Sequence, residues 1–94
     1  MSAFVLFADR TTDGNSAAFD VVTREYSLIR VYGTWDGANV QAFADFDQTG
    51  DYCQLQAGAW DRDDIKTIYL KPGVRLRLTL SGAGAGTSLN AEVL

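Results

Sequence analysis

Apolar and polar residues alternate along most of the chain, and turn-forming residues interrupt the alternation at short intervals. A period of two is typical of half-buried β-strands, and no window of about eleven or more residues has the apolar spacing of a helix. Turn signals lie at Asp13-Gly14-Asn15, Asp36-Gly37, Thr49-Gly50, Pro72-Gly73 and Gly82–Gly86. The predicted strands are 3–9, 17–23, 26–35, 38–46, 51–57, 65–71, 74–81 and 87–94.

Turns that recur every 8–12 residues or so are typical of a β-sandwich or a small barrel. We therefore predict an all-β fold, a single antiparallel β-sandwich of about eight strands that is jelly-roll-like or immunoglobulin-like. The chain has no linker and no internal repeat, so one domain is expected to span residues 1–94. A domain of this size buries only about 60% of its unfolded surface, and assembly with another chain would add to its stability.

The turn at Asp36-Gly37 predicts a three-stranded meander over residues 26–57 with one apolar inner face. A loop over residues 47–50 would join the second and third strands of this meander. The predicted cross-strand pairs are Trp35–Ala38, Gly33–Val40, Val31–Ala42, Ile29–Ala44, Ala44–Cys53 and Ala42–Leu55.

The outer face of this meander would carry aromatic and amide side chains, with Arg30 opposite Phe43 at cation–π distance. Tyr, Phe and Arg are enriched at protein interfaces. Either another part of the same chain covers this face, or a partner does, for which a sister subunit in a small ring, preferably a trimer, is one candidate. The residues predicted at the partner interface are Arg30, Tyr32, Gln41, Phe43, Tyr52 and Gln54.

Two further patterns leave alternatives open. In the strand over 65–71, Ile65 and Tyr69 alternate with Ile68 and Leu70, so either a bulge lies near the following turn or both faces of the strand are covered. The aromatic and amide residues would also suit a carbohydrate or receptor platform. In that alternative the loops 36–38 and 58–64 present the contact residues Trp35, Asp36 and Trp60.

Charge and hydropathy exclude several partner classes. The net charge is −4 and no run of Lys or Arg exceeds one residue, which argues against nucleic-acid binding. The longest apolar run, residues 3–8, is too short to span a bilayer and lacks the basic flank of a signal peptide. The chain is therefore expected to start at its own Met1, to fold in a cytoplasm and to bind no membrane.

Candidate catalytic chemistry is sparse. The chain has no histidine, and the register above turns its one cysteine, Cys53, inward as a small buried hydrophobe rather than a nucleophile. The loop over 45–51 resembles a calcium loop, but Gln56 stands where a bidentate Glu is needed, which favours a solvated turn.

The other acidic and glycine-rich stretches support no site either. Asp61, Asp63 and Asp64 cluster in a segment predicted to be a solvated loop. Gly82–Gly86 lacks the Lys-Ser/Thr pair and the helix of a phosphate loop, and is predicted to be a flexible connection between the last two strands. We expect no catalytic residue, metal site or cofactor, and so no enzyme.

Four stretches resemble small structural proteins of tailed-phage particles. The motifs are a "G-x-[WF]-D-G-A" hairpin, a "PG-x-[YR]-L" strand and a closing "SGAG…TSLNA-x-V", and the likeness covers about residues 28–94. Residues 1–25 match nothing in that family. The stretches that carry the likeness are Val31–Ala38, Leu70–Leu76, Leu80–Gly82 and Thr87–Ala91.

This resemblance implies a β-sandwich of the virion, made in the host cytoplasm, that decorates or cements the capsid or belongs to a tail or fibre. The expected function is a non-enzymatic capsid decoration or cement protein that stabilises the head lattice. Its expected partners are the major capsid protein or other virion proteins, together with sister subunits of a homo-oligomer. A tail or fibre module, or a carbohydrate- or receptor-binding module, is the alternative.

Overall fold

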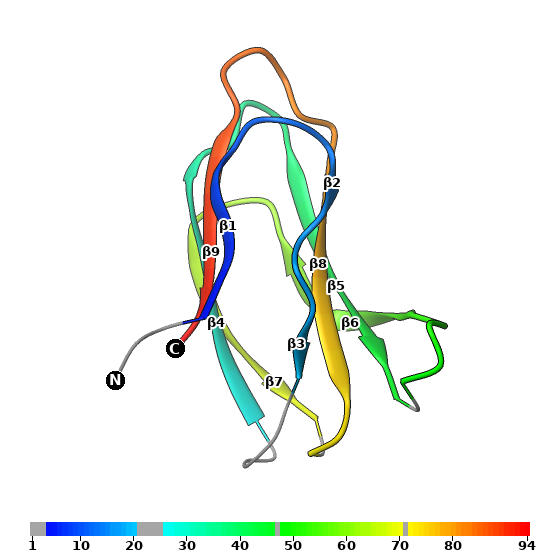
Figure 1. The fold of residues 1–94 in the computed structure, drawn as a ribbon. Helices are drawn as coiled ribbons and strands as arrows, with labels where there is room; N and C mark the ends of the chain where they lie inside the picture. Colours follow the sequence, from blue (N-terminus) through cyan, green and yellow to red (C-terminus); the bar gives the residue numbers. More distant parts are fainter. Residues whose placement is uncertain (1–3, 21–25, 47, 71) are drawn as a thin grey trace.

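The computed structural model describes residues 4–20, 26–46, 48–70 and 72–94. The described chain contains only strands, and these form two antiparallel sheets packed face to face (Figure 1). The predicted all-β sandwich is therefore confirmed. The strands are β1 (Phe4–Arg10), β2 (Gly14–Asn15), β3 (Phe19–Asp20), β4 (Tyr26–Thr34), β5 (Asn39–Asp45), β6 (Cys53–Trp60), β7 (Asp64–Tyr69), β8 (Arg75–Ser81) and β9 (Ser88–Val93).

Each predicted strand has a counterpart in the structure, with ends that differ by up to three residues in most cases. The strand predicted over 17–23 is the exception. Only Phe19–Asp20 of it is seen, as β3, and residues 21–23 lie outside the described residues. The short strand β2 was not predicted, because two residues are too few to show alternation.

The strand order identifies the sandwich as a jelly roll. Sheet A has the order β1-β9-β4-β7, and sheet B has the order β2-β8-β5-β6 with β3 also paired to β8. When β2 and β3 are counted as one interrupted strand, the first strand pairs with the last, the second with the second-last and the third with the third-last. The two middle strands, β5 and β6, pair with each other. This nested pairing of eight strands is the jelly-roll arrangement.

The predicted meander is wrong in its first half, because β4 and β5 do not pair. β4 lies between β9 and β7 in sheet A, whereas β5 lies between β8 and β6 in sheet B. The turn itself is as predicted: Ala38 N donates to Trp35 O at 2.9 Å, and both Asp36 and Gly37 have positive φ. The two strands then diverge into opposite sheets.

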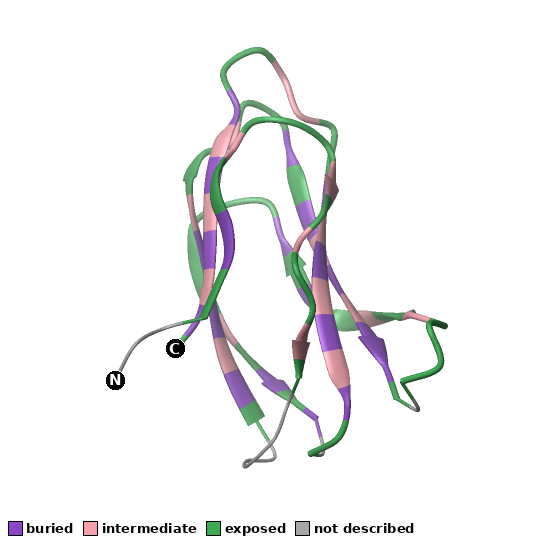
Figure 2. Cartoon of the chain, viewed as in Figure 1, coloured by how far each residue is buried: buried purple, intermediate pink, exposed green. Residues whose placement is uncertain are grey.

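The core lies between the sheets and contains most of the residues that the meander placed on its inner face. Ile29 and Val31 in sheet A, and Val40, Ala42 and Ala44 in sheet B, are all fully buried. Buried residues alternate with half-buried or exposed ones along β4, β5, β8 and β9 (Figure 2). The side chains therefore meet across the sandwich instead of side by side on one sheet.

The β1–β2, β4–β5 and β8–β9 connections, which join the two sheets, lie at one end of the molecule, at the top of Figure 1. There the β4–β5 turn lies beside the glycine-rich β8–β9 loop, and Gly86 N donates to Asp36 Oδ2 at 2.7 Å. Asp13 accepts from Ala83 N at 2.8 Å. The loop over 82–86, predicted as a flexible connection, is thus held by hydrogen bonds to two aspartates.

Candidate functional site

The six residues predicted to form one partner interface lie on two different faces. Arg30 and Tyr32 belong to β4 and lie on the outer face of sheet A. The other four lie on or beside β5 and β6 in sheet B. Because the two outer faces point in opposite directions, the structure does not bring these residues together. Those in sheet B are Gln41, Phe43, Tyr52 and Gln54.

The predicted cation–π contact between Arg30 and Phe43 is wrong for the same reason. The Arg30 guanidinium lies over the Tyr32 ring, 4.0 Å from its centroid, and pairs with Glu92 at 3.5 Å. In sheet B it is Arg77 of β8 that lies over the Tyr52 ring, 3.9 Å from its centroid. Each outer face thus has its own arginine stacked on a tyrosine.

Sheet A presents an apolar strip at its β7 edge. Ile65 is 52% exposed and Tyr69 is 78% exposed, and Tyr69 lies directly opposite the exposed Tyr26 of β4. The opposite face of β7 is covered, since Ile68 is buried. The alternative in which both faces of this strand are covered is therefore wrong, because one face packs on the core and the other is open. The alternative of a bulge near the following turn involves residue 71, which lies outside the described residues. The signal for this strip in the sequence was that both faces of the 65–71 strand carry apolar residues.

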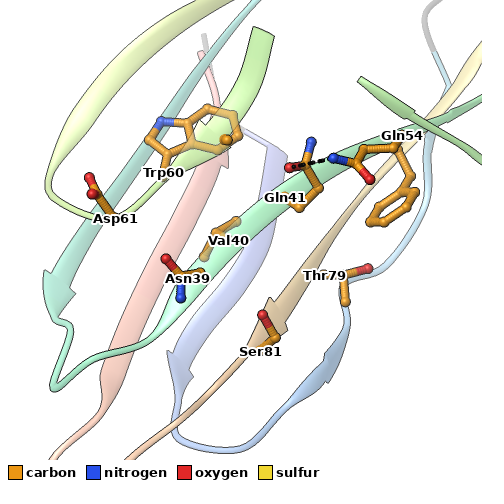
Figure 3. A pocket seen from close by; sticks show the side chains of 10 residues that line it. Asn39, Val40, Gln41, Gln54, Trp60, Asp61, Thr79 and Ser81 are labelled. Carbon is orange, nitrogen blue, oxygen red and sulfur yellow. Dashed lines mark hydrogen bonds between the residues drawn. The ribbon is translucent and has the colours of Figure 1, made fainter. Parts of the chain in front are cut away.

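Sheet B carries a shallow groove on its outer face, with a volume of about 730 Å³. The side chains that line it come from three neighbouring strands, β5, β6 and β8 (Figure 3). Most are neutral amides, hydroxyls or aromatic rings. The main contributors are Asn39, Gln41, Phe43, Gln54, Thr79 and Ser81.

A bulge in β6 shapes this groove. The predicted pair of Ala44 with Cys53 is confirmed, but Gln41 lies opposite Ala59, so the register shifts between these two pairs. The predicted pair of Ala42 with Leu55 is consequently absent from the ladder. Gln41 Nε2 donates to the carbonyl oxygens of Leu55 at 2.5 Å and Gly58 at 3.2 Å, within the bulge. The Gln41 amide therefore takes the place of ladder hydrogen bonds that the bulge removes.

Two polar side chains at one end of the groove are free. Asn39 and Ser81 lie opposite each other on β5 and β8 and are exposed. Within the described ranges of the chain, neither side chain has a hydrogen-bond partner. At the other end, Gln54 Nε2 donates to Gln41 Oε1 at 3.3 Å, the dashed contact in Figure 3.

One acidic side chain borders the groove. Asp61 follows Trp60 at the end of β6. The Arg62 guanidinium, hydrogen-bonded to Asp61 at 3.0 Å, lowers the pKa of that carboxyl. The carboxylate is thus ionised at neutral pH and its charge is matched by a neighbouring cation.

The tryptophans do not form the predicted receptor-contact loops. Trp60 is only 2% exposed and belongs to the core, because β6 extends to residue 60, into the segment predicted as a loop. Trp35 packs against the core, and its Nε1 donates to Asp63 Oδ1 at 2.8 Å. Asp36, the third residue of that alternative, is exposed but engaged with Gly86.

The remaining candidates for chemistry have structural roles or none. Cys53 is exposed, so the prediction that it is a small buried hydrophobe is wrong. Asp45 is 1% exposed and accepts from Thr49 N and Gly50 N, which closes the β5–β6 loop. Asp47 of the calcium-like stretch lies outside the described residues. Elsewhere in the described chain, no three Cys, Asp or Glu side chains are grouped as a metal site would require.

Comparison of the chain with protein-family models, with curated proteins and with solved structures found no match. No helix of the described residues is long and apolar enough to cross a membrane.

Proposed function

We propose that this protein is a non-enzymatic structural protein of a tailed-phage particle, a capsid decoration or cement protein. The motifs of residues 28–94 that resemble such proteins support this function, and the jelly-roll fold is one that viral capsid domains use. Because one fold hosts many functions, the proposal depends on a surface rather than on the fold.

The observation that carries the proposal is the apolar strip of sheet A, formed by Tyr26, Ile65 and Tyr69. Ile65 and Tyr69 lie on the edge strand β7, and Tyr26 lies opposite Tyr69 on β4. Exposed apolar side chains that share one outer face mark an interaction site. Arg30 and Tyr32, the sheet A half of the predicted interface, continue this surface along β4. The partner that binds this strip is the major capsid protein, and a sister subunit is the second candidate.

A cement protein acts by binding the assembled lattice more tightly than the free capsid subunits. The lattice then gains stability by mass action from each bound copy. Burying Ile65 and Tyr69 would contribute about 2–4 kcal/mol of apolar burial before the loss of association entropy. A small rigid sandwich suits this task, since little conformational entropy is lost when it docks.

The test is deletion of the gene from the source genome, followed by complementation. Particles without the protein should lose their DNA at a lower temperature, and the wild-type chain should restore the heat resistance. The Ile65→Lys and Tyr69→Lys variants should fold but fail to join particles. Gln56→Lys, at an exposed position of β6, is the matched control and should join normally.

The number of copies of the protein per particle distinguishes a head protein from a tail or fibre module. Quantitative mass spectrometry should find the protein in proportion to the capsid subunit. A few copies per particle would instead indicate a tail or fibre module, and complete absence from purified particles would refute a virion role. Normal incorporation of both lysine variants would show that the strip of sheet A is not the interface.

A further inference from the structure

The groove on the outer face of sheet B has no role in the function proposed above. It lies on the opposite side of the sandwich from the apolar strip of sheet A. A partner docked on sheet A would therefore leave it open to solvent. Its volume of about 730 Å³ is within the range of small-molecule sites.

The groove offers hydrogen-bonding groups that are already held in place. Asn39, Gln41 and Phe43 alternate along β5, so their side chains follow one another at intervals of about 7 Å on the same face. On β8, Ser81 lies opposite Asn39 and Thr79 lies opposite Gln41. β5 and β8 are interior strands with a partner on each side, which makes the floor of the groove rigid.

The Asn39 amide and the Ser81 hydroxyl, at one end of the groove, can hydrogen-bond the hydroxyl groups of a ligand. An Asn amide can donate and accept at once, and a Ser hydroxyl does the same. Asn39 and Ser81 lie side by side without partners among the described residues, so both are available to a ligand (Figure 3). Phe43 lies toward the other end, half-buried, with the Arg77 guanidinium 5.8 Å from its ring centroid. The part of its ring that lines the groove adds an apolar surface on which the C–H face of a sugar ring could rest.

Charge and backbone pairing exclude other ligands. No Lys or Arg lines the groove, Arg77 beside Phe43 is stacked on Tyr52, and the Asp61 carboxylate at the border is paired with Arg62. The groove therefore has no cluster of cations for phosphates or nucleic acids, and its neutral lining favours an uncharged ligand. An extended peptide would add to an open strand edge, whereas the free side chains Asn39 and Ser81 lie on β5 and β8, which are paired on both sides. An amphipathic helix would need a continuous apolar groove, whereas amides and hydroxyls interrupt this one.

We propose that this groove binds a neutral oligosaccharide. Asn39 and Ser81 hydrogen-bond its hydroxyl groups, and Phe43 packs against a sugar ring. Gln41 is a positioning residue, because its amide nitrogen is engaged by the carbonyls of the β6 bulge and so sets the shape of the groove wall. The distance from Asn39 to Phe43 along β5, about 13 Å, is longer than one sugar ring.

The experiment uses the purified full chain on an array of neutral and anionic glycans. The neutral glycan with the strongest signal is then titrated into ¹⁵N-labelled protein. We expect millimolar to micromolar binding to neutral glycans and chemical-shift changes at the backbone amides of Asn39, Gln41, Thr79 and Ser81. Asn39→Ala and Ser81→Ala should each weaken binding about three- to tenfold, the effect of one lost hydrogen bond.

Matched controls lie outside the groove. Thr67→Ala removes a hydroxyl from the outer face of sheet A, and Gln56→Ala removes an amide from an exposed position of β6. Both should bind like the wild type. The proposal is overturned if no neutral glycan binds, if only anionic glycans bind, or if the shift changes fall on sheet A. It is also overturned if the Asn39→Ala and Ser81→Ala variants fold and bind with unchanged affinity.

Discussion

At the scale of single residues, three aspartates hold the connections between the sheets. Asp13 accepts from Ala83 N, Asp36 accepts from Gly86 N, and Asp63 accepts from Gly33 N at 3.1 Å. Each bond joins segments that are distant in the sequence. In a jelly roll nearly every connection crosses between the sheets, so bonds of this kind replace the local pairing that hairpins would supply.

Asp36 combines such a bond with a strained backbone. Its φ is +45°, a region that Asn, Asp and Gly tolerate but that costs Ala about 1 kcal/mol. Asp36→Ala should therefore lower the free energy of unfolding by about 1–3 kcal/mol, from the lost hydrogen bond and the backbone strain together. Asp36→Asn keeps an acceptor oxygen and the tolerance for positive φ, and should change stability by less than half as much. Urea denaturation measures both, and equal effects of the two variants would contradict this role.

Cys53 is exposed because the half of β6 before the bulge is covered on neither face by the other sheet. All residues of Cys53–Ala57 are exposed except the half-buried Leu55. We expect one equivalent of thiol per chain to react with Ellman's reagent without denaturant. Cys53→Ser should abolish the signal and alter stability by no more than about 0.5 kcal/mol, as for other surface substitutions. A thiol that reacts only in denaturant would contradict this arrangement.

At the scale of elements, β6 consists of two halves joined by the bulge. The second half continues the ladder with β5 and carries Trp60 into the core, whereas the first half projects from the body (Figure 1). Gly58 lies at the bend, where an added Cβ would be 2.5 Å from the Ala42 Cβ. The bulge thus depends on a glycine that admits β5 closely and on a glutamine that binds its carbonyls.

Substitution of Gln41 tests whether its amide holds the bulge in β6. Gln41→Glu would place carboxylate oxygens against the Leu55 and Gly58 carbonyls and leave these acceptors without a donor. We expect a loss of about 2–4 kcal/mol in the free energy of unfolding. Gln54→Glu, which changes the exposed partner amide, is the matched control and should cost less than about 1 kcal/mol. If thermal unfolding of the two variants differs little, Gln41 does not hold the bulge.

At the scale of the whole molecule, the nested pairing places one continuous core between two sheets. Every second residue of β8 points into this core, and these residues are buried almost completely: Leu76, Leu78 and Leu80. Their strand is central in sheet B and faces sheet A along its length. In a domain of this size, stability depends strongly on such central positions.

Leu78→Ala should lower the free energy of unfolding by about 2–5 kcal/mol, because the site is closed on all sides and leaves a cavity. Since domains of this kind have only about 5–15 kcal/mol of stability, a marked drop in melting temperature follows. Thr67→Ala, at an exposed position of β7, should shift the melting temperature little. A small effect of Leu78→Ala in calorimetry would mean that the core is loosely packed.

The sequence by itself determined the fold class, the position of most strands and, for most of them, the side that faces the core. These properties follow from local alternation and turn chemistry, which is why Asp36-Gly37 forms its turn and why Ile29, Val31, Val40 and Ala42 are buried. The jelly-roll and immunoglobulin alternatives have the same local pattern, so alternation could not distinguish them.

Only the tertiary structure decided which strands are neighbours. A buried side chain on β4 satisfies the same alternation whether the side chains of β5 lie beside it in one sheet or opposite it in another. The nested pairing therefore separated Arg30 from Phe43 and divided the predicted interface between two faces. It also opened the outer side of β7 and, through the bulge in β6, exposed Cys53 and formed the groove over Asn39 and Ser81. These features depend on contacts between distant segments, which no local pattern records.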